Sequence, residues 1–355
     1  MSGITSVKSL AERGIQTVPL QYVRNPGEEI FNNINSSHAQ DVQIPIIDLH
    51  LHGLNVQPLS KSSVDEISSA AEKWGFFQIV NHGIPESLIA RVQAVGKAFF
   101  ELPIEEKELY KREGGGNNAG YGSKVGISAD AKLDWRDSYY NIVWPVSQRV
   151  MSKWPKQPSD FTEVMDEYSK KICKLWEVLM QALCGGLGLA NENALDEALG
   201  GERKEIHFTI NYYAPCPQPE QVIGFSSHSD ADALTILLQD QTPGLQVLKG
   251  DEWINVPCIP GALVVNIGDQ IEILSNGKYK SIEHRSFVQK NHVRMSWPMF
   301  CTPSQNVIIS PLKELINEEN PPLYAASSFQ EYLELFFTKG LIGKDHLTDF
   351  KNSSA

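Results

Sequence analysis

The pattern of hydrophobic and polar positions divides the chain into a helical first half and a strand-rich second half. Apolar residues recur at helical spacing in segments 61–74 and 160–187, and further helices are predicted at 7–13 and 86–100. Two short apolar runs, 44–48 and 76–83, predict buried strands among these helices. We therefore expect residues 1–200 to form a mostly helical N-terminal region, with short strands that join the core.

From residue 205 the pattern changes to short alternating segments rich in β-branched residues, which are separated by Gly, Pro, Asn and Asp turns. This spacing predicts an antiparallel sandwich or barrel over residues 201–310, rather than alternating strands and helices. A closing helix is predicted at 329–337, within a C-terminal helical segment, 311–355, that lies over the site. The expected fold is mainly β with a helical N-terminal layer, and we expect the three regions to fold as one unit.

Composition and charge narrow the classes of partner. The chain has 31 Lys and Arg against 43 Asp and Glu, and the net charge of −12 disfavours nucleic acid and anionic membranes as partners. No apolar run is long enough for a membrane span and no secretory signal is recognisable, so a cytoplasmic protein is expected. The five dispersed cysteines argue against a disulfide framework or a thiolate zinc site. The glycine-rich segment 113–122 lacks a phosphate-loop pattern, and it is either a flap near a site or an ordinary surface loop.

Two of the nine histidines stand out. His228 and Asp230 are two residues apart on a segment expected to be extended, where such side chains point the same way and can hold one metal ion. This motif alone is common by chance. His284 lies on a separate predicted strand, and two histidines with one carboxylate leave coordination positions open, as Fe(II) oxygenases require. Zinc with three protein ligands and one water is the competing metal.

Arg294 and Ser296 favour iron over zinc at this site. They follow His284 at an even offset, and the polar stretch 289–292 between them predicts a hairpin turn that would direct all three side chains at one cavity. A guanidinium offers a planar fork for a carboxylate, and a hydroxyl adds a second donor. A carboxylate-bearing cosubstrate beside the metal would explain this pair.

Several long, ordered motifs resemble the plant 2-oxoglutarate- and Fe(II)-dependent dioxygenases of specialised and hormone metabolism. They are NYYAPCPQPE (211–220), HSDADALTILLQD (228–240), NIGDQIEILSNGKYKSIEHR (266–285), RMSWPMF (294–300) and EKWGFFQIVNHGIP (72–85). The resemblance covers nearly the whole chain and implies a double-stranded β-helix, or jelly roll. It also implies Fe(II), 2-oxoglutarate and O2, with ascorbate as an activator, and a reaction through an Fe(IV)-oxo species that releases succinate and CO2.

The resemblance assigns roles residue by residue. The positions that match the family's iron ligands are His228, Asp230 and His284. The positions that match its contacts to 2-oxoglutarate are Arg294, Ser296, Tyr213 and Asn211. Alternation independently places Asn211 and Tyr213 on one face of their segment, together with His207, which receives no role. Three further residues of the family pattern are interpreted as structural: His82, Asp48 and Asp269.

The substrate positions resemble those of anthocyanidin and flavonol synthases, feruloyl-CoA hydroxylases and alkaloid-modifying relatives. Phe300 and Tyr140 match aromatic substrate contacts of these enzymes. The flavonoid enzymes carry a lysine, an aromatic and an acidic residue at three positions where this chain has Thr209, Ser138 and Thr302. We therefore expect an aromatic or polycyclic small molecule, such as a phenylpropanoid or an alkaloid, which is hydroxylated, desaturated or demethylated.

Asp232 is a further departure, because relatives often carry a small residue at this position. We expect it to face solvent at the entry to a strand, and the alternative is contact with a cationic nitrogen of an alkaloid.

Two other functions stay open at this point. One is an ethylene-forming oxidase that uses ascorbate instead of 2-oxoglutarate, and the other is a non-catalytic jelly-roll binding protein. The favoured interpretation is a monomeric oxygenase.

Overall fold

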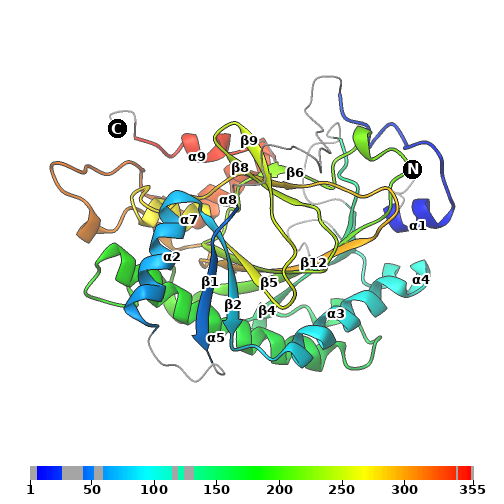
Figure 1. The fold of residues 1–355 in the computed structure, drawn as a ribbon, viewed down its shortest axis with the longest axis horizontal. Coiled ribbons are helices and arrows are strands. Elements are labelled where there is room, and N and C mark those ends of the chain that lie inside the picture. Colours follow the sequence, from blue (N-terminus) through cyan, green and yellow to red (C-terminus); the bar gives the residue numbers. More distant parts are fainter. Residues whose placement is uncertain are drawn as a thin grey trace.

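The computed structural model describes residues 6–25, 43–51, 59–113, 119–123, 132–340 and 343–352. Two β-sheets form the centre of this part of the chain (Figure 1). The strands of the larger sheet are, in spatial order, β1 (Ile46–Leu51), β2 (Phe76–His82), β10 (Leu263–Ile267), β7 (Leu234–Gln239), β12 (Arg294–Thr302), β5 (Glu205–Tyr213), β4 (Asp137–Trp144) and β3 (Gly120–Gly122). Those of the smaller sheet are β6 (Phe225–His228), β11 (His284–Ser286), β8 (Leu245–Lys249) and β9 (Glu252–Asn255).

Antiparallel pairing dominates both sheets. Strands β1 and β2 are parallel, and the other neighbouring strands of the two sheets are antiparallel. A short antiparallel ribbon of β13 (Ile308–Ile309) and β14 (Ser327–Ser328) precedes the C-terminal helices. The predicted mainly antiparallel core with a helical N-terminal layer is therefore confirmed.

Helices cover the outer side of the larger sheet. In Figure 1, α5 and α3 run below the strands β2, β4 and β5, and α2 and α3 both pack against α5. Helix α5 ends at Gly188, whose φ of 75° is left-handed and whose N–H bonds the carbonyls of Cys184 and Gly185. The helices are α1 (Val7–Glu12), α2 (Lys61–Lys73), α3 (Glu86–Glu101), α4 (Ile104–Glu108), α5 (Phe161–Leu187), α6 (Ala194–Ala198), α7 (Asp269–Leu274), α8 (Phe329–Lys339) and α9 (Asp345–Thr348). All five helices predicted from the sequence are present, with ends that differ by a few residues.

Strand β5 shows why the sequence pattern worked in the second half of the chain. Ile206, Phe208 and Ile210 point to the helical side and belong to one large hydrophobic cluster, which runs from Ile47 in β1 to Leu347 in α9. The alternate residues of the strand line a cavity between the two sheets. The apolar face therefore anchors the sheet, and the polar face is available for binding.

Some elements were not predicted. Strands β3 and β4 add two neighbours to the edge of the larger sheet, and the fully buried α7 interrupts the strand-rich half. Within the glycine-rich segment 113–122, residues 120–122 form β3, and residues 114–118 lie outside the described residues. No helix in the described ranges is long and apolar enough to cross a membrane. All five cysteines are free thiols.

Candidate active site

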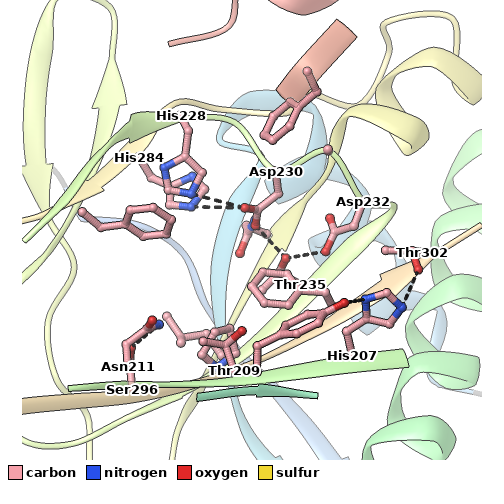
Figure 2. A pocket seen from close by; sticks show the side chains of 18 of the residues that line it. His207, Thr209, Asn211, His228, Asp230, Asp232, Thr235, His284, Ser296 and Thr302 are labelled. Atoms are coloured by element: carbon pink, nitrogen blue, oxygen red, sulfur yellow. Dashed lines mark hydrogen bonds and ion pairs between the residues drawn. The ribbon is translucent and has the colours of Figure 1, made fainter. Parts of the chain in front are cut away.

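The two histidines and the aspartate singled out in the sequence come together between the sheets. Strands β6 and β11 are neighbours, and His228 pairs directly with His284 across them. Asp230 follows two residues after β6, and its Oδ1 lies 3.5 Å from His228 Nε2 and 3.6 Å from His284 Nε2. All three residues are buried, and their ligand atoms lie within 4.8 Å of one another (Figure 2). This group could hold a metal ion.

The hydrogen bonds of the two imidazoles suit metal binding through Nε2. His228 Nδ1 lies 2.7 Å from the carbonyl of Ser226, and His284 Nδ1 lies 3.2 Å from the carbonyl of Ile282. Because a carbonyl only accepts, each Nδ1 carries the proton of the neutral ring and leaves the Nε2 lone pair free. Burial, and then the neighbouring His228, lower the pKa of His284 to about 4, so this ring is neutral near pH 7.

Asp230 is held so that one carboxylate oxygen faces the histidines. Its Oδ2 accepts hydrogen bonds from Thr235 Oγ1 at 2.6 Å and from Asn266 Nδ2 at 2.7 Å, which leaves Oδ1 toward the two rings. Burial opposes ionisation of this carboxyl, but the two histidines and Thr235 hold its pKa below the usual range. This carboxylate is therefore ionised and oriented toward the two rings.

Asp232 does not face solvent, so that expectation is wrong. It is buried and lines the cavity, with Oδ2 2.8 Å from Thr235 Oγ1. Thr235 has one hydroxyl hydrogen and contacts both aspartates, so a protonated Asp232 can donate to Thr235 while Thr235 donates to Asp230. Burial, and then the charge of Asp230, raise the pKa of Asp232 well above its usual value, in agreement with this arrangement.

The residue between the two ligands ties the site to the C-terminal segment. Ser229 Oγ donates to Asp269 Oδ2 at 3.1 Å, and Tyr332 Oη and His346 Nε2 contact the same oxygen at 2.7 and 2.9 Å. Gly343 pairs with this strand through backbone hydrogen bonds to residues 227 and 229. Asp269 is therefore an anchor of the fold, as expected from the sequence.

Arg294 and Ser296 enter the same cavity from the larger sheet, but not through a hairpin. Strand β11 belongs to the smaller sheet and β12 to the larger one, so the segment 287–293 crosses between the sheets and the predicted hairpin is wrong. His284 and Arg294 nevertheless line the same cavity because they approach it from the two sheets. The sequence analysis therefore predicted correctly that the two side chains share a cavity, but it attributed this to a hairpin that the structure does not contain.

Arg294 has the features of a carboxylate receptor. It is 1 % exposed, its Nη2 lies 3.3 Å from Gln239 Oε1, and its Nε and Nη1 have no hydrogen-bond partner in the part of the chain that the structure describes. Its guanidinium carbon lies 5.0 Å from the ring centre of Tyr213. Burying a guanidinium with two unsatisfied N–H donors costs free energy unless an anion accepts hydrogen bonds from them. A carboxylate of 2-oxoglutarate can be that anion. Asn211 Nδ2 lies 3.3 Å from Ser296 Oγ beside it (Figure 2).

The whole cavity, about 380 Å³, has room for a small organic molecule. Phe300, Tyr140, Thr209 and Thr302 all line it, whereas Ser138 does not. The Ser138 hydroxyl contacts Arg112 Nη2 at 3.0 Å and the carbonyl of residue 122, and Arg112 lines the cavity instead.

Helix α8 closes the cavity with apolar side chains. The helix begins at Ser328, which forms a reciprocal capping box with Glu331. The residues of this segment that line the cavity are Phe329, Leu333, Phe336, Phe337 and Gly340. This wall offers a dry surface for a ring system.

Several polar residues of the cavity were not predicted from the sequence, among them Glu205, His207, Arg112 and Arg136. Tyr140 Oη lies 2.5 Å from His207 Nδ1, and His207 Nε2 lies 2.9 Å from Glu205 Oε2, so these side chains form a hydrogen-bonded chain. Alternation along β5 could have found Glu205 and His207, because they share a face with Thr209. Arg112 and Arg136 also line the cavity, and they had no comparable signal.

Family models match both halves of the chain. The 2OG-Fe(II) oxygenase superfamily model matches residues 205–303, and a model for the N-terminal region of a non-haem dioxygenase in morphine synthesis matches residues 44–157. Leucoanthocyanidin dioxygenase of Perilla frutescens is 40 % identical over 92 % of each chain. Jasmonate-induced oxygenase 4 of Arabidopsis thaliana is 40 % identical over 97 % of this chain and 96 % of its own.

A crystal structure of JOX2 in complex with 2OG, Fe and JA has a TM-score of 0.86 and 39 % identity, over 99 % of this chain and 98 % of that one. The protein thus belongs to the 2-oxoglutarate- and Fe(II)-dependent oxygenase superfamily. It has the double-stranded β-helix of that family and is an oxidoreductase whose cofactors are iron and 2-oxoglutarate.

Proposed function

We propose that the cavity is the active site of an oxygenase in which His228, Asp230 and His284 hold Fe(II). One observation carries this proposal: the buried ligand cluster shares a cavity with a buried arginine that has two uncommitted nitrogens. Two imidazoles and one carboxylate leave other coordination positions open, as this class of oxygenase needs. When bound, iron with 2-oxoglutarate and O2 supplies the oxidant for a C–H bond, and succinate and CO2 are released.

In this proposal the larger sheet binds the cosubstrate. Arg294 binds the distal carboxylate through Nε and Nη1, and Ser296 adds a hydroxyl donor. Tyr213 and Asn211 complete the subsite from β5, which pairs with β12 at both positions. Thr235 and Asn266 orient Asp230, so the ligand oxygen is in place before the metal binds.

We propose that the organic substrate is an aromatic or polycyclic specialised metabolite, which lies between α8 and the larger sheet. Phe300 and Tyr140 would flank its rings, and Thr209 leaves room that a lysine would fill. Thr302 and Asp232 border the same space. The names of the relatives, which include leucoanthocyanidin dioxygenase and flavonol synthase/flavanone 3-hydroxylase, support a small-molecule substrate and agree with hydroxylation.

Succinate formation tests the oxygenase. Purified enzyme with Fe(II), 2-oxoglutarate and ascorbate should form succinate slowly alone and faster with an accepted substrate. His284→Ala should abolish both rates, whereas His292→Ala, at an exposed histidine on the loop before β12, should leave them unchanged. Absence of succinate at every condition would contradict the proposal, and substrate oxidation with ascorbate alone would indicate the ascorbate-dependent oxidase.

We propose further that the regions 1–200, 201–310 and 311–355 act as one folding unit, since a single hydrophobic cluster contains residues of all three. One cooperative melting transition would support this, and two separate transitions would contradict it.

We also propose a cytoplasmic monomer without nucleic-acid partners. Five free thiols suit a reducing compartment, and the net charge of −12 opposes nucleic acid. Light scattering of the purified chain tests the oligomeric state.

A further inference from the structure

Arg136 is a buried cation on the cavity wall, and its charge has no carboxylate partner among the described residues. It precedes β4, is 4 % exposed and lines the cavity. Its Nη1 donates to Asn211 Oδ1 at 2.5 Å, which is a neutral acceptor. The nearby carboxylate of Asp134 is engaged elsewhere, because its Oδ1 lies 2.6 Å from Arg24 Nη2 and 2.6 Å from Ser226 Oγ. Asp134 favours the Arg136 charge without a direct side-chain contact. A buried charge that lacks a direct carboxylate contact is costly, so a missing anion is indicated.

The Arg136 guanidinium is held in place close to the metal site. Its central carbon lies 3.5 Å from the ring centre of Phe225, and the Phe225 ring lies 4.2 Å from the ring of His228. The aromatic face and Asn211 fix the orientation of the guanidinium, so binding an anion there requires little ordering of the side chain. An anion on Arg136 would therefore be held one ring away from a proposed metal ligand.

The charges of the proposed active site balance without Arg136. The two charges of Fe(II) and the one of Arg294 are offset by Asp230 and by the two carboxylates of 2-oxoglutarate. Other carboxylates on the cavity wall are engaged: Asp232 contacts Thr235, and Glu205 contacts His207. Arg136 thus adds a positive charge that neither the metal nor the cosubstrate neutralises.

A second arginine adds positive charge to the wall of the same cavity. Arg112 lines the same cavity, and burial, followed by the positive charge of Arg136, lowers its pKa to about 10. Burial is also the main cause that lowers the pKa of Arg136. An anion in this part of the cavity would relieve the repulsion between the two guanidinium groups.

We propose that Arg136 binds a carboxylate carried by the organic substrate, so that the substrate is an aromatic or polycyclic acid and not an alkaloid base. This inference rests on the proposed function, because it takes the metal and cosubstrate subsites as assigned there. A carboxylate on Arg136 would orient the acid with its ring system toward the apolar wall of α8. The cosubstrate is the other possible source of a carboxylate for Arg136, and the experiment separates the two.

Binding to matched pairs of acids and amides tests the proposal. Enzyme loaded with Fe(II) and 2-oxoglutarate under nitrogen is titrated in a calorimeter with 2-naphthoate, cinnamate and 4-phenylbutyrate, and with the primary amide of each. The wild type should bind at least one acid about tenfold to a hundredfold more tightly than its amide, the range expected for a hydrogen bond between charged groups. Arg136→Met should abolish this preference while the enzyme still binds 2-oxoglutarate, and Arg136→Lys should retain part of the preference.

Arg149→Met provides the matched control. Arg149 also lies over an aromatic ring, 4.9 Å from Trp154, but it pairs with Asp166 and does not line the cavity, so its loss should leave the acid preference intact. Absence of an acid preference in the wild type, or a preference that survives Arg136→Met, would overturn the proposal. So would weaker 2-oxoglutarate binding as the sole effect of Arg136→Met. Failure of the wild type to bind 2-oxoglutarate would instead contradict the proposed function. The preference for acids over amides would then be measured with enzyme that is loaded with the metal alone.

Discussion

Gly244 approaches Arg294 so closely that one added methyl group should disturb cosubstrate binding. A Cβ at this position would lie 2.3 Å from Arg294 Cδ and 2.7 Å from its Nε, whereas ordinary contacts begin at 3.4 Å. The shortfall is 3.4 minus 2.3, or 1.1 Å. The methyl group has little room to turn away, because the backbone oxygen of Phe287 would be 3.1 Å from it. The stem of Arg294 must therefore move.

A movement of about 1 Å is enough to misalign a planar fork with a carboxylate. Hydrogen bonds between charged groups contribute about 1.5–3 kcal/mol, so Gly244→Ala should raise the dissociation constant of 2-oxoglutarate about tenfold to a hundredfold. Calorimetric titration of the iron-loaded enzyme under nitrogen measures this constant directly. It is independent of the unknown organic substrate.

Gly122→Ala is the matched control for this substitution. It adds the same methyl group, but the nearest atom beyond its chain neighbours, Arg112 Cδ, would be 3.8 Å away. The control should bind 2-oxoglutarate like the wild type. If Gly244→Ala also binds 2-oxoglutarate normally and melts like the wild type, Arg294 does not supply the fork and the reasoning is refuted.

Four other substitutions probe the rest of the site. His228→Ala or His284→Ala should abolish iron binding and turnover while the far-UV circular dichroism stays native, and normal activity in either variant would remove these ligands from consideration. Thr235→Val removes one of the donors to Asp230, and we expect about a ten- to hundredfold loss of metal affinity, measured by competition with a chelator. Unchanged affinity would show that Asn266 alone orients the carboxylate. Phe300→Ala should weaken substrate binding and spare 2-oxoglutarate, because stacking contributes about 0.5–1.5 kcal/mol beyond buried area. Equal damage to both constants, with a lower melting temperature, would show that Phe300 is merely core.

The sequence predicted the parts of the fold in which one face of an element differs from the other. Helix α5 has an apolar face, and β5 alternates between Phe208 in the core and Thr209 on the cavity. The proposed metal cluster was also predictable, since His228 and Asp230 combine metal-ligand chemistry with a two-residue spacing. The sequence pattern of one segment was enough to predict the structure wherever the environment of a residue is set by its neighbours in the chain.

The missed features depend on contacts between distant segments. The fully buried face of β4 includes the polar residues Asp137 and Asn141, so apolar and polar residue types do not alternate along the strand, and Arg136 beside it has no sequence signal. The turn-like residues between β11 and β12 do not reveal that the chain changes sheets there. Asp232 looks like a solvent-facing acid, but it is buried by Thr235 and by the close approach of Gly268. None of these facts has a local signature.

The backbone pairing of Gly343 with residues 227 and 229 joins the C-terminal segment to the strand that ends in His228. Docking of that segment and occupancy of the metal site are therefore expected to be linked equilibria, and each must favour the other by the same free energy. Residues 343–352 would then exchange their amide hydrogens more slowly in the iron-loaded enzyme than in the metal-free one. The C-terminus would act as a reporter of metal loading, and metal-free chains would be the first to be trimmed by proteases.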